Sequence, residues 1–229
     1  MRKSILLLLI PLLLAGCRKE GFVPYTGLEA GQICDGVITT DGGVRLVIDS
    51  NPGNYNITTG RRVLASYKAT AAEGDKSYRI DLEELRETSV VEPVPSSEPR
   101  GVLSDDPVRI DEAWFSGGYL NVGIAYNGTD PAHHRFPATY EIAEGKVVFR
   151  IWHDAWENFP ARDPLQRAFL CYPLDSLTKE YMDLNPGAGK KKNPAIPVLL
   201  QWRWYAQEGE TTQDEIILYE KEGTFLPAS

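Results

Sequence analysis

Cysteine, methionine and histidine are scarce in this chain, and their scarcity excludes several classes of function. The 229 residues hold three cysteines, two methionines and three histidines. No CxxC pair and no Cys/His zinc spacing occurs, which argues against a zinc module or a thioredoxin-like redox site. G-x-S-x-G is also absent, and no serine or cysteine has a local setting typical of a nucleophile. We therefore expect no catalytic residue, no metal ion and no cofactor, and predict that the protein is not an enzyme.

Positive charge is also in short supply. Lysine and arginine number 24 against 32 aspartates and glutamates, which gives a net charge of −8. Proteins hold nucleic acid mainly through Lys and Arg contacts to phosphates, so we expect no nucleic-acid partner. The acidic balance would instead suit a basic partner such as a cationic peptide.

No apolar run reaches the roughly 20 residues that a membrane-spanning helix needs. The longest, Ile5 to Leu14, follows the basic residues Arg2 and Lys3, as in a signal peptide. It ends in Leu14-Ala15-Gly16-Cys17, which resembles the lipobox of bacterial lipoproteins. An ordinary secretory signal with a chance cysteine is the alternative interpretation.

The lipobox implies cleavage before Cys17 and attachment of lipid, such as palmitate, to that cysteine. A multiply acylated cysteine is a strong membrane anchor. We expect a signal peptide over residues 1–16, a tether over 17–32, and a location in the cell envelope, at the outer membrane of a Gram-negative bacterium. The mature chain would carry 22 basic and 32 acidic residues, because cleavage removes Arg2 and Lys3.

Long helical periodicity is missing, whereas glycine (20) and proline (16) are plentiful, and this combination predicts an all-β fold. Short alternating segments over residues 33–92 predict a small, partly open, OB-like barrel. Its expected strands are Cys34–Thr40, Val44–Asp49, Arg61–Thr70 and Ser77–Leu82. The stretch Leu82–Val91 fits either a helical turn or a last strand.

A proline-rich stretch over residues 93–105 predicts a linker to a second domain over 106–229. That domain opens with a hairpin, Val108–Phe115 and Tyr119–Tyr126, in which Leu120, Val122, Ile124 and Tyr126 share one face. The adjacent acids Asp111-Glu112 predict a bulge or an exposed edge. About seven short strands predict an immunoglobulin-like β-sandwich, with a helical turn over Leu174–Leu177.

The two remaining cysteines, Cys34 and Cys171, lie in different predicted domains. An envelope compartment permits disulfides. Because of their separation we expect these two cysteines to be buried or free, although a bridge between them is the alternative.

Four loop residues, Trp152, His153, Asp154 and Trp156, form a candidate ligand surface. Tryptophan rings stack on sugars and polar groups bond hydroxyls, so this loop favours a glycan ligand. A metal site with the His133-His134 pair is the alternative, but no third ligand has a telling spacing, and solvated loop histidines are the preferred interpretation.

One short motif suggests a modification. Asp175-Ser176-Leu177 matches a pattern that some envelope bacteria O-glycosylate on the hydroxyl of Ser176. A helical turn capped by Asp175 explains the same residues without modification.

Three segments together resemble the NigD-like family of envelope lipoproteins: Asp41–Asp49, Gly60–Tyr67 and, most specifically, Ser104–Tyr126. The resemblance implies an N-terminal OB-like domain and a C-terminal β-sandwich, in the order that the patterning predicts. An immunity role has been associated with this family, but it supplies no catalytic motif. We therefore expect a lipid-anchored envelope protein with a non-catalytic binding role towards an unknown protein or cationic peptide. The family association adds an expectation of a bacteriocin-immunity-like role. A glycan-binding lipoprotein is the alternative.

Overall fold

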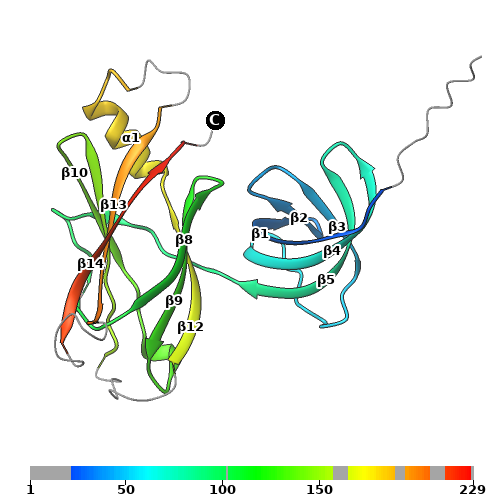
Figure 1. Cartoon of the computed structure of the whole chain (residues 1–229), viewed down its shortest axis with the longest axis horizontal. Coiled ribbons are helices and arrows are strands. Elements are labelled where there is room, and N and C mark those ends of the chain that lie inside the picture. Colours follow the sequence, from blue (N-terminus) through cyan, green and yellow to red (C-terminus); the bar gives the residue numbers. More distant parts are fainter. Residues whose placement is uncertain (1–21, 102, 157–164, 189–193, 207–214, 228–229) are drawn as a thin grey trace, which may run out of the picture.

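The chain folds into two β domains joined by a short connection (Figure 1). The computed structural model describes residues 22–101, 103–156, 165–188, 194–206 and 215–227. A five-stranded barrel comes first and a sandwich of two sheets follows, so the all-β prediction is confirmed. Within the described residues, no helix has the length and apolar character needed to cross a membrane.

The barrel has the strand order β1-β2-β3-β5-β4, and β4 pairs back onto β1. Its strands are β1 (Tyr25–Cys34), β2 (Val37–Thr40), β3 (Arg45–Ser50), β4 (Arg62–Gly74) and β5 (Ser77–Glu87). Within the barrel, only β3 and β5 pair in parallel, and the other neighbours are antiparallel. The expected OB-like barrel is therefore present, but it is closed rather than partly open.

Strand β1 closes the barrel, although the sequence predicted a tether over residues 17–32. That prediction is wrong from Tyr25 onwards. The positions of β1 that face the barrel interior include Gly27, Glu29 and Gly31, so the apolar alternation that marks a strand is missing. Gly27 leaves room for the ring of Tyr67, whose hydroxyl donates to Glu29.

The sandwich consists of one sheet ordered β14-β13-β11-β10-β7 and another ordered β6-β12-β9-β8. Its first strands are β6 (Ser89–Val90), β7 (Val94–Pro95), β8 (Arg109–Ser116), β9 (Tyr119–Asn127) and β10 (Ala138–Ala143). The others are β11 (Lys146–Ile151), β12 (Leu165–Pro173), β13 (Ile196–Tyr205) and β14 (Ile216–Phe225).

These strands outnumber the seven that the sequence predicted. Three pairs are parallel, β6–β12, β7–β10 and β11–β13. An immunoglobulin sandwich has two antiparallel sheets. The immunoglobulin-like label is therefore corrected to a mixed sandwich.

The domain boundaries also differ from the prediction. The strands β6 and β7 lie one in each sheet of the sandwich. The chain therefore enters the second domain at Ser89, and not after a linker over residues 93–105. Each of these strands has only two residues, which is too short for a recognisable alternation.

The hairpin of β8 and β9 is confirmed, with a register shift between Ile110 and Glu112 where a bulge or edge was expected. The helical turn is longer than expected, because α1 spans Asp175–Leu184 and buries Leu177 and Tyr181. A short 3₁₀ helix, η1, covers Pro131–His133.

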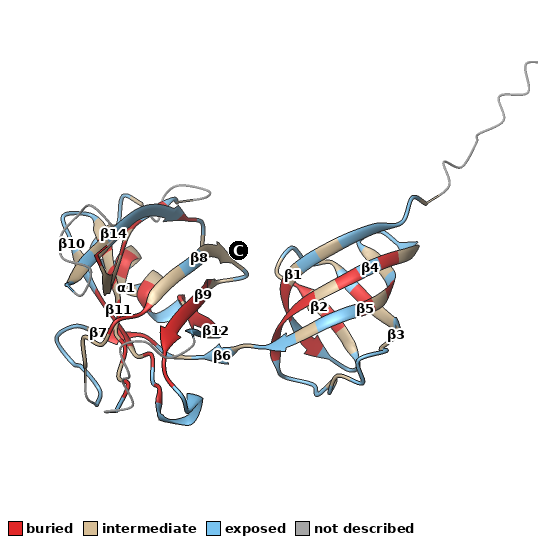
Figure 2. Cartoon of the chain, turned by 60° about the horizontal axis from the view of Figure 1, so that its bottom comes forward, coloured by how far each residue is buried: buried red, intermediate tan, exposed pale blue. Residues whose placement is uncertain are grey.

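The buried side chains form one core inside the barrel and another between the two sheets, coloured red in Figure 2. The inward face predicted for β9, Leu120, Val122, Ile124 and Tyr126, belongs to the sandwich core. The opposite face of β9 turns towards the barrel, and it positions the site described next.

Candidate functional site

A buried arginine joins the two domains. Arg62, at the start of β4, donates from its two terminal nitrogens to Asp41, at 2.9 and 2.7 Å, within the barrel. It also donates to Oδ1 of Asn121 at 2.7 Å and, from Nε, to Sγ of Cys171 at 3.1 Å, both in the sandwich. Its guanidinium lies 3.9 Å from the ring centroid of Tyr119. We call this set of contacts the Arg62 junction.

The side chains of the Arg62 junction are almost inaccessible to solvent, and their polar groups form hydrogen bonds with one another. Arg62 is 7% exposed, and Asn121 and Cys171 are fully buried. Burial opposes the charge of Arg62, but its hydrogen bonds to Asp41 and Cys171 outweigh burial, and the pKa of the guanidinium lies above its ordinary value. Ser116 donates to Asp41 and accepts from Asn121, which closes the network.

Apolar contacts surround this polar centre. Ala30 and Leu64 of the barrel pack against Phe169 and Cys171 of β12, with Trp114 at their side. The barrel thus rests on the outer face of the sheet β6-β12-β9-β8. The hydrogen bonds from Arg62 to Asn121 and Cys171 and from Ser116 to Asp41, together with these apolar contacts, join the barrel to the sandwich.

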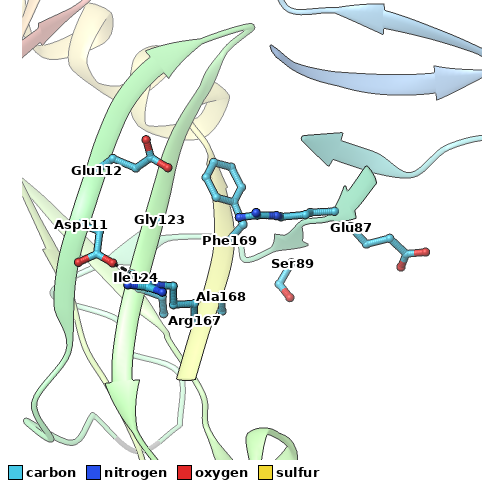
Figure 3. Close-up of a pocket in the computed structure, with 10 residues that line it drawn as sticks. Glu87, Ser89, Asp111, Glu112, Gly123, Ile124, Arg167, Ala168 and Phe169 are labelled. Carbon is cyan, nitrogen blue, oxygen red and sulfur yellow. Dashed lines mark ion pairs between the residues drawn. The ribbon is translucent and has the colours of Figure 1, made fainter. Parts of the chain in front are cut away.

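The barrel covers only part of that sheet face, and a cleft of about 630 Å³ remains beside the Arg62 junction. We call it the interdomain cleft. Both domains line it, as Figure 3 shows, with Glu87 from the barrel and Glu112, Arg167 and Phe169 from the sandwich. Ser89 of β6 borders it at the domain connection.

Small residues make the floor of the interdomain cleft. Gly123 of β9 and Ala168 of β12 are the small residues that line it. The side chain of Glu112 lies over Gly123, where an added Cβ would approach it to 2.8 Å. Larger residues at these positions would fill the cleft.

The charges in the interdomain cleft are mostly paired. Asp111 accepts from Arg109 at 2.6 Å and lies 3.6 Å from Arg167. Glu87 pairs with an arginine of its own barrel. Arg86 also lines the cleft, pairs with Glu84 and interacts electrostatically with Glu112. Glu112 itself forms no salt bridge among the described residues, so its carboxylate can accept a hydrogen bond from a ligand.

A second hollow of about 500 Å³ lies on the other side of β6 and β12. We call it the inner hollow, because it is lined by side chains that face between the two sheets, including Tyr126, Phe136 and Leu170. Ser89 and Ala168 border both the inner hollow and the interdomain cleft. The two spaces therefore meet at one edge of β12.

Two histidines form a buried pair beside the inner hollow. Nδ1 of His153 lies 2.8 Å from the carbonyl oxygen of Pro107, and its Nε2 lies 2.8 Å from Nδ1 of His134. Since a carbonyl only accepts, His153 donates to Pro107 and accepts from His134. Burial lowers the pKa of His153 to about 4 and also lowers the pKa of His134. Both imidazoles are therefore neutral at pH 7.

The four residues of the candidate ligand surface predicted from the sequence do not form one surface in the structure. His153 is fully buried, so its place on that surface is wrong, and so is the view of His134 and His153 as solvated loop residues. Trp152 is half-buried, with the guanidinium of Arg150 3.8 Å from its ring centroid. The β-type alternation of this segment turns neighbouring side chains to opposite sides.

Trp156 and Asp154 remain together at the surface. Trp156 is 62% exposed and its backbone nitrogen donates to Asp154. Its φ angle of +42° is unusual for a large side chain. The guanidinium of Arg135 lies 5.4 Å from the indole ring, and both Arg135 and Asp154 line the inner hollow.

The two thiols are free, Cys34 at the surface and Cys171 in the Arg62 junction, so the bridge considered between them does not form. No group of three or more potential metal ligands occurs among the described residues. Ser176 is exposed on the first turn of α1. Cys17 lies outside the described residues.

Sequence reasoning missed the Arg62 junction and the interdomain cleft. One signal was available: the outward face of β9 carries Asn121, Gly123 and Ala125, a polar residue followed by small ones. A solvated sheet face would carry longer polar side chains. The partners Asp41 and Arg62 gave no signal, because both resemble ordinary turn and surface residues.

The fold and the junction define a class, namely two-domain all-β proteins in which a closed barrel is held against a mixed β-sandwich. Within this class, residues 91–186 match the family model of the NigD-like C-terminal beta sandwich domain. The resemblance to NigD-like proteins that the sequence predicted is thus confirmed. A search of curated proteins found no match.

Solved structures share the fold at low sequence identity. A NigD-like immunity protein from Bacteroides caccae ATCC 43185 is 21% identical, with a TM-score of 0.66 over 90% of this chain and 99% of the other. A candidate lipoprotein from Bacteroides fragilis NCTC 9343 is 17% identical, with a TM-score of 0.59 over 86% and 97%. A protein of unknown function from Bacteroides vulgatus ATCC 8482 is 16% identical, with a TM-score of 0.59 over 90% and 92%.

Proposed function

We propose that this chain is a lipid-anchored protein of the bacterial cell envelope that binds a partner and catalyses no reaction. The interdomain cleft is the observation that carries the proposal. Two domains are locked by the Arg62 junction, and the cleft beside it takes its lining from both. A rigid cleft loses little conformational entropy on binding, which favours recognition.

The lipid anchor is supported by the lipobox ending at Cys17. It is also supported by the candidate lipoprotein from Bacteroides fragilis, which has the same fold. The described structure begins at Phe22, and Phe22 already packs against the barrel core. Four residues separate Phe22 from Cys17, so the Cα atoms of these two residues are at most about 17 Å apart. We place the barrel close to the membrane, on the outer membrane of a Gram-negative bacterium.

The anchor is tested by replacing Cys17 with alanine in the full chain. We expect loss of incorporated palmitate and release from membranes, or retention of the unprocessed precursor. A Cys34→Ala variant is the matched control and should be labelled as the wild type is. Normal palmitate labelling of the Cys17→Ala variant would contradict the proposed anchor.

A basic peptide or protein is the partner that the charge favours. After removal of the signal peptide the chain would hold 22 basic and 32 acidic residues. The NigD-like immunity protein from Bacteroides caccae has the same fold, and this supports protection against a cationic peptide toxin as the biological role. Cells that express the chain should survive higher doses of such peptides than cells with an empty vector. Equal survival across a panel of cationic peptides would count against the immunity role.

Glycan binding is the second candidate, and exposed Trp156 is the observation that favours it. The indole is available for stacking, and Arg135 and Asp154 beside it offer hydrogen bonds to hydroxyls. A glycan array probed with the full chain in detergent would test it. We expect binding that is lost in Trp156→Ala and retained in Trp156→Phe, because phenylalanine keeps an aromatic face. An array without saturable binding would remove this candidate.

A further inference from the structure

Strand β12 is paired unequally on its two sides. Along one side it pairs with β9 from Leu165 to Pro173. On the other side it pairs with β6 at Leu170 and Cys171 only. Within the described chain, no strand covers the other edge of residues 165–169. An uncovered edge presents unpaired backbone groups that another strand can use.

The direction of those backbone groups follows from one hydrogen bond. The carbonyl of Cys171 accepts from the backbone nitrogen of Val91 at 2.9 Å, so the backbone groups of Cys171 face the β6 side. Successive residues of a strand turn these groups to alternate sides. Arg167 and Phe169 therefore also point theirs to the β6 side, at positions that precede the first residue of β6.

The interdomain cleft and the inner hollow lie on opposite faces of the sheet at this same edge. The cleft is on the face of Arg167 and Phe169, and the inner hollow is on the face of Leu170. Ala168 borders both. Since side chains of a strand alternate between faces, a strand added here would send its side chains in turn into the two spaces.

We propose that the free edge of β12 at residues 165–169 binds an extended peptide as an added strand, with basic side chains in the interdomain cleft and apolar side chains in the inner hollow. This inference rests on the proposed partner-binding function and deepens it. Binding by strand addition combines backbone hydrogen bonds for affinity with side-chain pockets for specificity. Five residues of β12 offer an edge of about 17 Å, which suits a short peptide segment.

The residues that line the interdomain cleft and the inner hollow indicate which peptide side chains each space would bind. In the interdomain cleft, Glu112 interacts electrostatically with Arg86 but forms no salt bridge among the described residues, and it lies on β8, two strands from β12. A lysine or arginine would satisfy it, and Phe169 offers an aromatic ring nearby. The inner hollow offers Tyr126, Phe136 and Leu170 to an apolar side chain.

The test uses the full chain in detergent and a capped seven-residue peptide in which lysine and valine alternate. Calorimetry gives the affinity, and hydrogen exchange reports the backbone amides of Arg167 and Phe169. We expect saturable binding with slower exchange of both amides. A glutamate–valine peptide of the same length should bind at least tenfold more weakly.

Two further peptides isolate the backbone contribution. One carries N-methyl groups on its lysines and the other on its valines. In an added strand the amides of only one residue set face β12, since direction and side-chain face both alternate with period two. One methylated peptide should therefore lose at least tenfold in affinity while the other keeps it. Equal effects of the two methylations would overturn strand addition.

Protein variants give an independent check. Glu112→Gln should reduce the affinity several-fold, whereas Glu141→Gln, an exposed residue on β10 in the other sheet, should not. Arg167→Pro removes an edge amide and should weaken binding, because proline is tolerated on edge strands. If that variant does not fold, the methylated peptides still decide the matter.

The outcomes separate the inference from the function on which it rests. Peptide binding that leaves the Arg167 and Phe169 amides unprotected would overturn strand addition and keep the binding role. Failure of the lysine–valine peptide to bind at millimolar concentration would also overturn strand addition, and the cell-survival assay would then judge the binding role alone. Glycan binding that no peptide displaces would favour the second candidate function instead.

Discussion

The Arg62 junction allows a quantitative prediction about what holds the two domains together. Arg62→Ala removes four donated contacts, two to Asp41 and one each to Asn121 and Cys171. The carboxylate of Asp41 is only 11% exposed and would keep the hydroxyl of Ser116 as a donor. Breaking a buried ion pair by removing one partner costs about 3–5 kcal/mol. We expect a loss of stability in that range.

The neighbouring residue Arg61 provides a matched control. Its side chain is 47% exposed and pairs with Glu87 at the surface. Exposed ion pairs contribute about 0–1 kcal/mol. Arg61→Ala should therefore shift the free energy of unfolding by no more than about 1 kcal/mol.

Two measurements test the Arg62 prediction. Urea denaturation gives the free energy of unfolding, and we expect the single transition of the wild type to separate into a barrel and a sandwich transition in Arg62→Ala. Small-angle X-ray scattering should show a larger radius of gyration, because the domains are no longer held in one orientation. If Arg62→Ala costs no more than Arg61→Ala and leaves the scattering unchanged, the reasoning is refuted.

Three other predictions concern single residues. Because the folded-state pKa of His153, about 4, lies below the unfolded value of about 6.5, its contribution is complete above pH 6.5 and is lost as the pH falls towards 4; wild type should lose about 2 kcal/mol between pH 7 and 5 in urea denaturation, and His153→Gln clearly less. A pH dependence identical in the two proteins would contradict this. Gly31→Ala should cost about 1–3 kcal/mol, since its Cβ would lie 2.5 Å from a backbone oxygen of β2, whereas the open site of Gly74 should tolerate alanine; a stable Gly31→Ala variant would argue against the close approach of β1 and β2. Iodoacetamide should label Cys34 in the native protein and Cys171 only after unfolding, as mass spectrometry of digests can show; equal native labelling would contradict the buried junction.

Local patterns in the sequence were sufficient to predict those strands in which apolar and polar residues alternate. The hairpin of β8 and β9 was predicted together with its irregularity at Asp111-Glu112, because alternation and turn residues are local signals. Strand β1 was missed for the opposite reason. Its inward positions include Gly27, Glu29 and Gly31, which do not form an apolar alternation. Gly27 and Glu29 contact Tyr67, and Gly31 lies close to the backbone of β2.

The Arg62 junction and the interdomain cleft could not be predicted from the sequence, because they depend on contacts between residues far apart in the chain. Nothing near Arg62 in the sequence indicates that it meets Asn121 and Cys171 across a domain boundary. Similarly, the sequence predicted His153 and His134 to be solvated loop residues. In the structure Tyr126 packs against both rings, and Pro107 and Phe136 contact His153, so both rings are buried. Burial of a polar side chain is a tertiary property, because it depends on which segments cover it.

The sequence by itself thus determined the all-β class, the two-domain order, the resemblance to NigD-like proteins and the expectation of a lipid on Cys17. These follow from composition, period-two patterns and short motifs, all of which are local. Only the tertiary structure showed that the barrel closes, that Arg62 joins it to the sandwich, and that no strand of the described residues pairs with the β6 side of residues 165–169 of β12. Those features depend on contacts between strands that are far apart in the sequence. Packing across the whole fold decides which strands come into contact, so local patterns cannot predict them.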